Sequence, residues 1–130
     1  MPKVDFSGVG EPVADGTYTV QLEKYTLIPA KDDKEDTYRL EFEIVEDGDY
    51  LGRRLFRNYT LSGNALFFLK RDLVRMGLDP DLISGEVEME DVLPLVVGYQ
   101  GEAKVTQRTY NGRVYNDIEV LDQSLVDLPF

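Results

Sequence analysis

The sequence of 130 residues contains no cysteine, no histidine and no tryptophan. Without cysteine the chain can form neither a disulfide nor a thiolate metal site, and without histidine it lacks the commonest general base and metal ligand. No stretch approaches the ~20 consecutive apolar residues of a membrane-spanning helix, and the first residues lack the apolar run of a signal peptide. These absences predict a cytoplasmic binding protein that is not an enzyme and has no metal, no other cofactor and no membrane contact.

The charge is acidic overall but unevenly distributed. The formal net charge of -11 disfavours a nucleic-acid binder, because phosphate contacts need lysine and arginine. Residues 31–49 carry nine acids against three bases, and residues 79–91 carry six acids and no base. In contrast, residues 50–78 carry six bases against Asp72 alone, and residues 104–116 contain no acid. Such segregation predicts a basic groove on an acidic body, although solvated charged faces would give the same pattern.

Alternation of apolar and polar residues predicts five β-strands, at residues 17–27, 37–46, 53–61, 99–109 and 113–121. The last two strands are separated by Asn111-Gly112, which predicts a tight hairpin turn. This order is typical of a mostly β protein with an OB-fold-like five-stranded barrel, a fold that binds single strands or sugars. Another small barrel, or a sandwich with one helix, would give a similar order.

One α-helix is predicted between strands 3 and 4, at residues 64–76, and short helical turns near Asp81 and Glu90 are left open. Leu66, Leu69, Leu73 and Met76 recur at helical spacing in this stretch, and Ser62 or Asn64 is expected to cap the helix, with Gly77 as the stop. The length fits a single domain over residues 1–121, with residues 1–16 as an extended N-terminal arm and residues 122–130 as an acidic, apolar tail.

The third strand and the last hairpin combine cations for phosphates with flat rings for bases, as single-strand binding requires. Strict alternation places Arg54, Phe56 and Asn58 on one face of the third strand. Phe56 is then either an exposed stacking platform or part of the core. The basic side of the helix, with Lys70, Arg71 and Arg75, is interpreted as solvated. The predicted nucleic-acid contacts are Arg39, Arg53, Arg54, Phe56, Arg57, Tyr59, Lys104, Arg108, Tyr110, Arg113 and Tyr115.

The tail ends in Asp127, Leu128, Pro129 and Phe130. It resembles the terminal tip of bacterial single-stranded-DNA-binding proteins, which docks onto replication and repair partners. That tip has more consecutive acids and follows a long disordered linker, whereas here the last predicted strand ends about nine residues earlier. Docking to replication or recombination proteins and packing onto a protein domain are therefore both open.

The whole chain also resembles a phage family of small single-stranded-DNA-binding proteins, long catalogued as a domain of unknown function. The matching residues are short motifs, namely Gly16-Thr17-Tyr18, Gly52-Arg53, Leu73, Met76-Gly77 and Asn116-Asp117-Ile118. The resemblance implies an OB-type barrel, coating of single-stranded DNA without sequence preference, and a phage-encoded role in replication or recombination. DNA and RNA both stay open as ligands, as do a monomer and a homo-oligomer.

Two other functions fit parts of the sequence. Pro80-Asp81 followed by Glu102-Ala103-Lys104 has the spacing of a PD-(D/E)xK metal-dependent nuclease, which needs both halves on neighbouring strands. The acidic segments 31–49 and 79–91 would instead suit an interaction protein that mimics DNA, although such a mimic does not need the basic residues between them.

Overall fold

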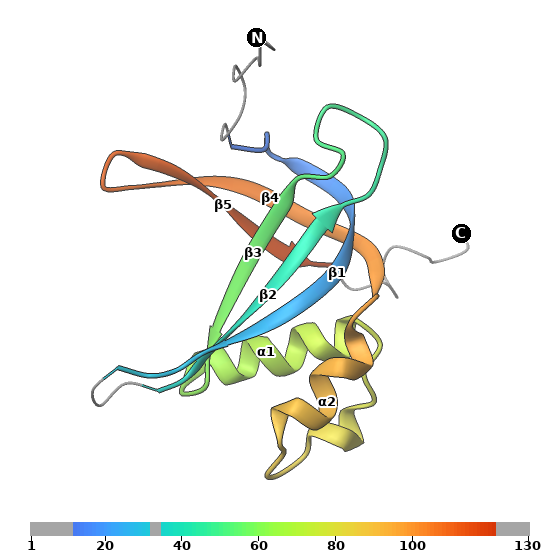
Figure 1. Ribbon diagram of the computed structural model, residues 1–130, viewed down its shortest axis with the longest axis vertical. Coiled ribbons are helices and arrows are strands. Elements are labelled where there is room, and N and C mark those ends of the chain that lie inside the picture. Colours follow the sequence, from blue (N-terminus) through green and yellow to red (C-terminus); the bar gives the residue numbers. More distant parts are fainter. Residues whose placement is uncertain (1–11, 32–34, 122–130) are drawn as a thin grey trace, which may run out of the picture.

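Five antiparallel strands form one sheet in this protein, whose computed structural model describes residues 12–31 and 35–121. The expectation of a mostly β protein is confirmed (Figure 1). In the described residues the sheet has the order β3-β2-β1-β4-β5. The strands are β1 (Gly16–Ile28), β2 (Thr37–Ile44), β3 (Arg54–Thr60), β4 (Gln100–Tyr110) and β5 (Arg113–Val120).

The central strand β1 is long enough to pair with both halves of the sheet. Its first residues, Gly16 to Gln21, pair with β4, and Val20 to Ile28 pair with β2. The register with β2 shifts between Leu22 and Lys24, and such an irregularity bends a strand and increases its twist. The bend separates the β2–β3 pair from the β4–β5 hairpin, which run in different directions in Figure 1.

The sheet stays open in the described residues. Its two edge strands, β3 and β5, lie near each other in space, but no backbone ladder joins them. The side chain of Arg57 spans the gap, because its Nη1 donates a hydrogen bond to the Ile118 carbonyl oxygen at 2.7 Å. The edge of the sheet is therefore bridged by a guanidinium group rather than by strand pairing.

Three helical segments connect β3 to β4, where one helix was predicted. They are α1 (Asn64–Arg75), the 3-10 helix η1 (Pro80–Ile83) and α2 (Met89–Val96). The expected caps Ser62 and Asn64 are wrong, because Gly63 is the N-cap of α1 and provides no side-chain hydrogen bond. Gly77 ends the helix as expected, with a positive φ of 98° that favours glycine.

The core lies between the inner face of the sheet and the two helices, which Figure 1 places at one end of the sheet. Alternate residues of β2, including Leu40, Phe42 and Ile44, are buried because a strand turns every second side chain to the same face. The helices contribute Leu69, Leu73 and Met76 from α1 and Val92, Leu93 and Val96 from α2. Leu66, expected on the same stripe, is 46% exposed.

A carboxylate of α2 fastens this helix to the sheet. Glu90 accepts hydrogen bonds from the hydroxyl of Tyr38 at 2.8 Å and from that of Tyr25 at 3.0 Å. Burial of the Tyr38 ring, together with its bond to Glu90, raises the pKa of Tyr38 to about 12. The two tyrosines therefore stay protonated at neutral pH and keep α2 against β1 and β2.

Part of the predicted N-terminal arm belongs to the fold. Val13 is fully buried, and the Asn116 side chain accepts from the Val13 amide and donates to its carbonyl, both at 2.8 Å. Gln107 also donates to the Val13 carbonyl. Residues 1–11 of the arm and residues 122–130 of the tail lie outside the described residues. Among the helices of the described part, none is long and apolar enough to cross a membrane.

Candidate functional site

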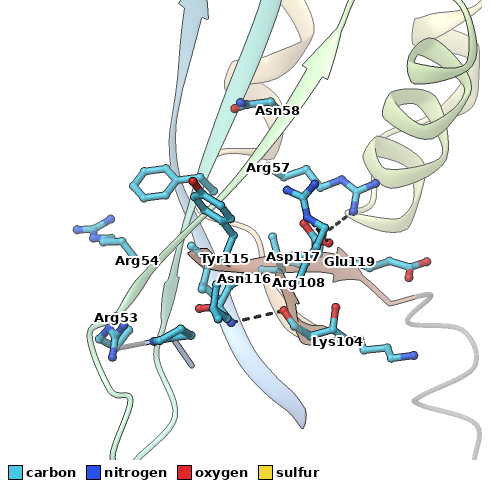
Figure 2. A pocket seen from close by; sticks show the side chains of 16 residues that line it. Arg53, Arg54, Arg57, Asn58, Lys104, Arg108, Tyr115, Asn116, Asp117 and Glu119 are labelled. Carbon is cyan, nitrogen blue, oxygen red and sulfur yellow. Dashed lines mark hydrogen bonds and ion pairs between the residues drawn. The ribbon is translucent and has the colours of Figure 1, made fainter. Parts of the chain in front are cut away.

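A groove of about 800 Å³ separates β3 from the β4–β5 hairpin. It brings together the two stretches that the sequence analysis selected separately, the third strand and the last hairpin. Figure 2 shows Arg53 and Arg54 on the β3 side and Tyr115, Asn116 and Arg108 on the hairpin side. The predicted contact residues that line the groove are Arg53, Arg54, Phe56, Arg57, Lys104, Arg108 and Tyr115.

Phe56 is an exposed platform on β3. The residue is 47% exposed, because alternation turns Leu55 into the core and leaves Phe56 outside. The guanidinium of Arg39, on the neighbouring strand β2, lies over the Phe56 ring at 5.6 Å from its centroid. Arg39 also donates from Nε to the Asn58 amide oxygen at 3.1 Å, which holds it beside the ring. Arg39 is not among the groove-lining residues and contacts Phe56 from β2.

Tyr59 is a core residue, so its prediction as a contact is wrong. Only 2% of the residue is exposed, and its hydroxyl donates to the fully buried carboxylate of Asp72 on α1. Burial and the neighbouring Asp72 raise the pKa of the Tyr59 hydroxyl well above its ordinary value. A ring enclosed in this way has no face available for stacking on a base.

Arg57 forms the floor of the groove and is already engaged there. Besides its bond to the Ile118 carbonyl, its Nε lies 4.0 Å from the Asp72 carboxylate, and its guanidinium lies over the Tyr59 ring. Because buried groups hold Arg57 on several sides, its role is to position β5 against β3. Its guanidinium is less available to a ligand than those on the rim.

Two rim arginines are paired with carboxylates. Arg54 lies 3.2 Å from Glu41 and 3.7 Å from Glu43, both on β2, and Arg108 lies 3.2 Å from Asp117 across the hairpin. The Arg108 and Asp117 side chains are 59% and 48% exposed, and exposed pairs of this kind contribute roughly 0–1 kcal/mol. A phosphate group can therefore displace Asp117 from Arg108 at little cost, whereas Glu41, beside Arg54, is only 17% exposed.

The remaining groove cations differ in their surroundings. Lys104, on β4, forms no ion pair with any described residue. Arg53 precedes β3, and its guanidinium lies 5.9 Å from the centroid of the Tyr50 ring. Lys104 thus has no ion pair among the described residues, and Glu119 lies opposite it in the β4–β5 register.

The hairpin tip extends beyond the groove and carries exposed rings. Asn111 and Gly112 both have positive φ angles, 53° and 76°, as the predicted tight turn requires. Tyr110 is 61% exposed and pairs across the turn with Arg113, while Tyr115 is 43% exposed and faces the groove. Tyr110 and Arg113 do not line the groove, so they could contact only a ligand that continues past its end.

Other groove residues were not among the predicted contacts. They include Pro12, Asn58, Thr106, Asn116, Asp117 and Glu119. Asn116 holds the Val13 backbone beside the groove, a role that only the three-dimensional contact reveals. The acids Asp117 and Glu119 alternate with Ile118 on β5, so the strand pattern itself could have placed them on the groove side.

Two basic residues of α1 support β5 from outside the groove. Glu119 lies 3.4 Å from Arg71 and 3.2 Å from Arg75, and Arg75 also donates to the Val120 carbonyl at 3.0 Å. Arg71 in addition lies 3.0 Å from the buried Asp72. These arginines are therefore structural links between α1 and β5 rather than free solvated charges.

The nuclease motif is split between two kinds of element. Asp81 lies in η1, whereas Glu102 and Lys104 lie on β4, so Asp81 is not on a strand beside them as the motif requires. In the described part of the chain, no three histidine, cysteine or acidic side chains are grouped as a metal site would need.

The fold and the groove define a class: a small, mostly β protein with an open five-stranded antiparallel sheet and a basic, aromatic groove between its edge strands. Comparison of the sequence with models of protein families and with curated proteins finds no match. The functional inference accordingly depends on the geometry and chemistry of the groove.

Proposed function

We propose that this protein binds single-stranded DNA in the groove between β3 and the β4–β5 hairpin, without sequence preference and without catalysis. The observation that carries the proposal is the convergence of two exposed rings, Phe56 and Tyr115, with cations from both sides of one groove. Stacking on an aromatic ring is open to every base, and phosphate contacts are the same for every nucleotide. Such a surface favours single strands over any one sequence.

In this proposal, bases stack on Phe56 and Tyr115 while phosphates take the place of carboxylates beside Arg54 and Arg108. Each stacked base contributes roughly 1–3 kcal/mol, and Lys104 adds a cation free of competing ion pairs with described residues. The protein supplies binding and orientation only. Its role would be to cover single strands during replication or recombination, as its resemblance to a phage family suggests.

We further propose that the sheet is an OB-type barrel left open at the β3–β5 edge. The order β3-β2-β1-β4-β5 brings the first and last strands of the sheet towards each other, and Arg57 crosses the remaining gap. In an OB-fold the ligand lies across the face of the middle strands and the adjoining loops. A groove bounded by β3 and the hairpin is compatible with this mode of binding.

The proposal is tested by titrating a labelled oligo-dT strand into the protein at two salt concentrations. Phe56→Leu and Tyr115→Leu should each weaken binding, by up to roughly 1–3 kcal/mol, with little change in the salt slope. The slope of log affinity against log salt concentration should flatten by roughly 0.7 in each of three variants, because each loses a phosphate contact that releases counterions. These variants are Arg54→Gln, Lys104→Gln and Arg108→Gln. Because the chain has no histidine, affinity should change little between about pH 6 and 8.

Lys31→Gln is the matched control. It removes the same charge at an exposed position beyond the end of β1, outside the groove. If Lys31→Gln flattens the slope as much as Lys104→Gln, the groove is not the site. If the unaltered protein fails to bind oligo-dT even at low salt, the proposal is overturned.

A second candidate function is an acidic interaction protein that occupies the DNA site of another protein. The observation that favours it is the pairing of Arg54 with Glu41 and Glu43, which leaves less positive charge on the groove rim than the sequence indicates. This candidate predicts no binding to oligo-dT and saturable binding to a basic DNA-binding partner, so the same titration separates the two.

A further inference from the structure

The outer side of α1 carries apolar surface that the core does not use. Phe67 is 67% exposed and Leu66 46%, while Phe68 is 38% exposed and contacts Phe67 edge to face. Exposed apolar residues that cluster, unlike those scattered singly, commonly mark a surface that another segment covers. This surface is separate from the groove, whose lining includes no residue of α1.

A hollow of about 240 Å³ lies beside these residues, between α1 and the segment that contains η1. Its α1 side consists of Leu66, Leu69, Lys70 and Leu73, which recur at intervals of three and four and so share one side of the helix. The opposite side is also mainly apolar and consists of Ile83, Gly85, Val87 and Met89. The hollow therefore suits a short apolar segment with room for one or two side chains.

We propose that residues 122–130 of the same chain bind this α1 surface. Their sequence, DQSLVDLPF, combines four large apolar residues with the acids Asp122 and Asp127. The exposed side of α1 offers the complementary combination, apolar side chains together with the exposed Lys70. The one acid of α1, Asp72, is fully buried and does not oppose an acidic segment.

The point at which the chain leaves the sheet supports binding within one molecule. Arg75, in the last turn of α1, donates to the carbonyl of Val120, the final residue of β5, so the described chain leaves the sheet near the end of the helix. Nine extended residues reach roughly 30 Å, whereas the twelve residues of α1 extend about 18 Å. Such a short connection gives an effective concentration on the order of millimolar, which makes even weak apolar contacts sufficient.

The absence of tryptophan provides a direct test in the chain of 130 residues. Phe67→Trp places a single indole on the exposed α1 surface, where its emission reports whether water or another segment surrounds it. In this background, replacing both Leu128 and Phe130 with serine should shift the emission to longer wavelength. Gln123→Ala in the same background should leave the emission unchanged. When the indole is placed instead at Leu95, an exposed position on α2, the two serine substitutions should also leave the emission unchanged.

Adding a synthetic peptide with the sequence of residues 122–130 to the doubly substituted protein should reverse the shift with saturation. The emission of the parent Phe67→Trp protein should not depend on protein concentration. An unchanged emission on substitution would overturn the proposal. If the emission of the parent Phe67→Trp protein moved to shorter wavelength only at high protein concentration, the proposal would also be overturned. The α1 surface would then be assigned to a second copy of the chain. The proposal does not depend on the groove, so failure of oligo-dT binding leaves this test intact.

Discussion

Replacing Asp117 with asparagine should strengthen binding of single-stranded DNA if Arg108 exchanges a carboxylate for a phosphate. In the free protein Arg108 Nε lies 3.2 Å from the Asp117 carboxylate, and both side chains are about half exposed. Breaking an exposed pair costs roughly 0.2–1 kcal/mol, so removing this cost should tighten binding roughly 1.5- to 5-fold at low salt.

The assay is the oligo-dT titration at several salt concentrations, with urea unfolding to verify that the variant is as stable as the parent. Asp81→Asn is the matched control, because it makes the same change of net charge at an exposed position in η1, away from the groove. Equal tightening by the two variants would mean that only the overall charge matters. If Asp117→Asn left affinity unchanged while the protein still bound DNA, Arg108 would not be a phosphate contact.

Three further predictions concern stability. Tyr59→Phe removes a buried hydroxyl bonded to a carboxylate and should lower the free energy of unfolding by about 1–3 kcal/mol in urea titrations, whereas Tyr110→Phe at the exposed hairpin tip should not. Burial raises the pKa of Tyr59 and of Tyr38 above the value for tyrosine in the unfolded chain. Their contribution to stability should therefore be fully present below about pH 10 and be lost as the pH rises further. Urea midpoints that stay constant up to about pH 11 would contradict this prediction. Asn116→Ala removes both hydrogen bonds to Val13 and should lower the free energy of unfolding by about 1–3 kcal/mol. The Val13 amide should then exchange faster with solvent, as measured by NMR. Unchanged exchange would show that the contact does not stabilise the fold.

The strands could be predicted from sequence because the sheet has one buried face. In β2 the alternation that ends at Ile44 corresponds to alternate burial, and the Asn111-Gly112 turn has the positive φ angles that this pair favours. The helical segments after α1 were less predictable. η1 is too short to show a period, and α2 contains Pro94 within an otherwise apolar and acidic run.

Within the site, it was harder to predict which side chains of β3 point into the core. An inward Leu55 requires that Arg57 and Tyr59 point the same way. The arginines on either side of Leu55, Arg53 and Arg57, made this arrangement costly from sequence alone. The cost is avoided because Arg57 lies at the open edge, where it reaches the Ile118 carbonyl, and because Asp72 accepts the Tyr59 hydroxyl. Both partners are distant in sequence, so no local pattern indicates them.

The ion pairs of the groove rim also depend on long-range structure. Arg54 meets Glu41 and Glu43 because the β2–β3 register places Glu43 opposite Arg54. Counting charges along the sequence therefore overstated the positive charge available to a ligand.

The gap between β3 and β5 has a consequence for solubility. An edge strand with free backbone groups can pair with a strand of another molecule, which is a common route to aggregation. In the described residues the two unpaired edges lie near each other, and Arg57 already occupies the Ile118 carbonyl. A strand of a second molecule that paired with an edge facing the groove would meet the charged side chains that line it, and charged side chains at an edge oppose such pairing. An unclosed sheet can in this way remain accessible to a ligand and still be protected against self-association.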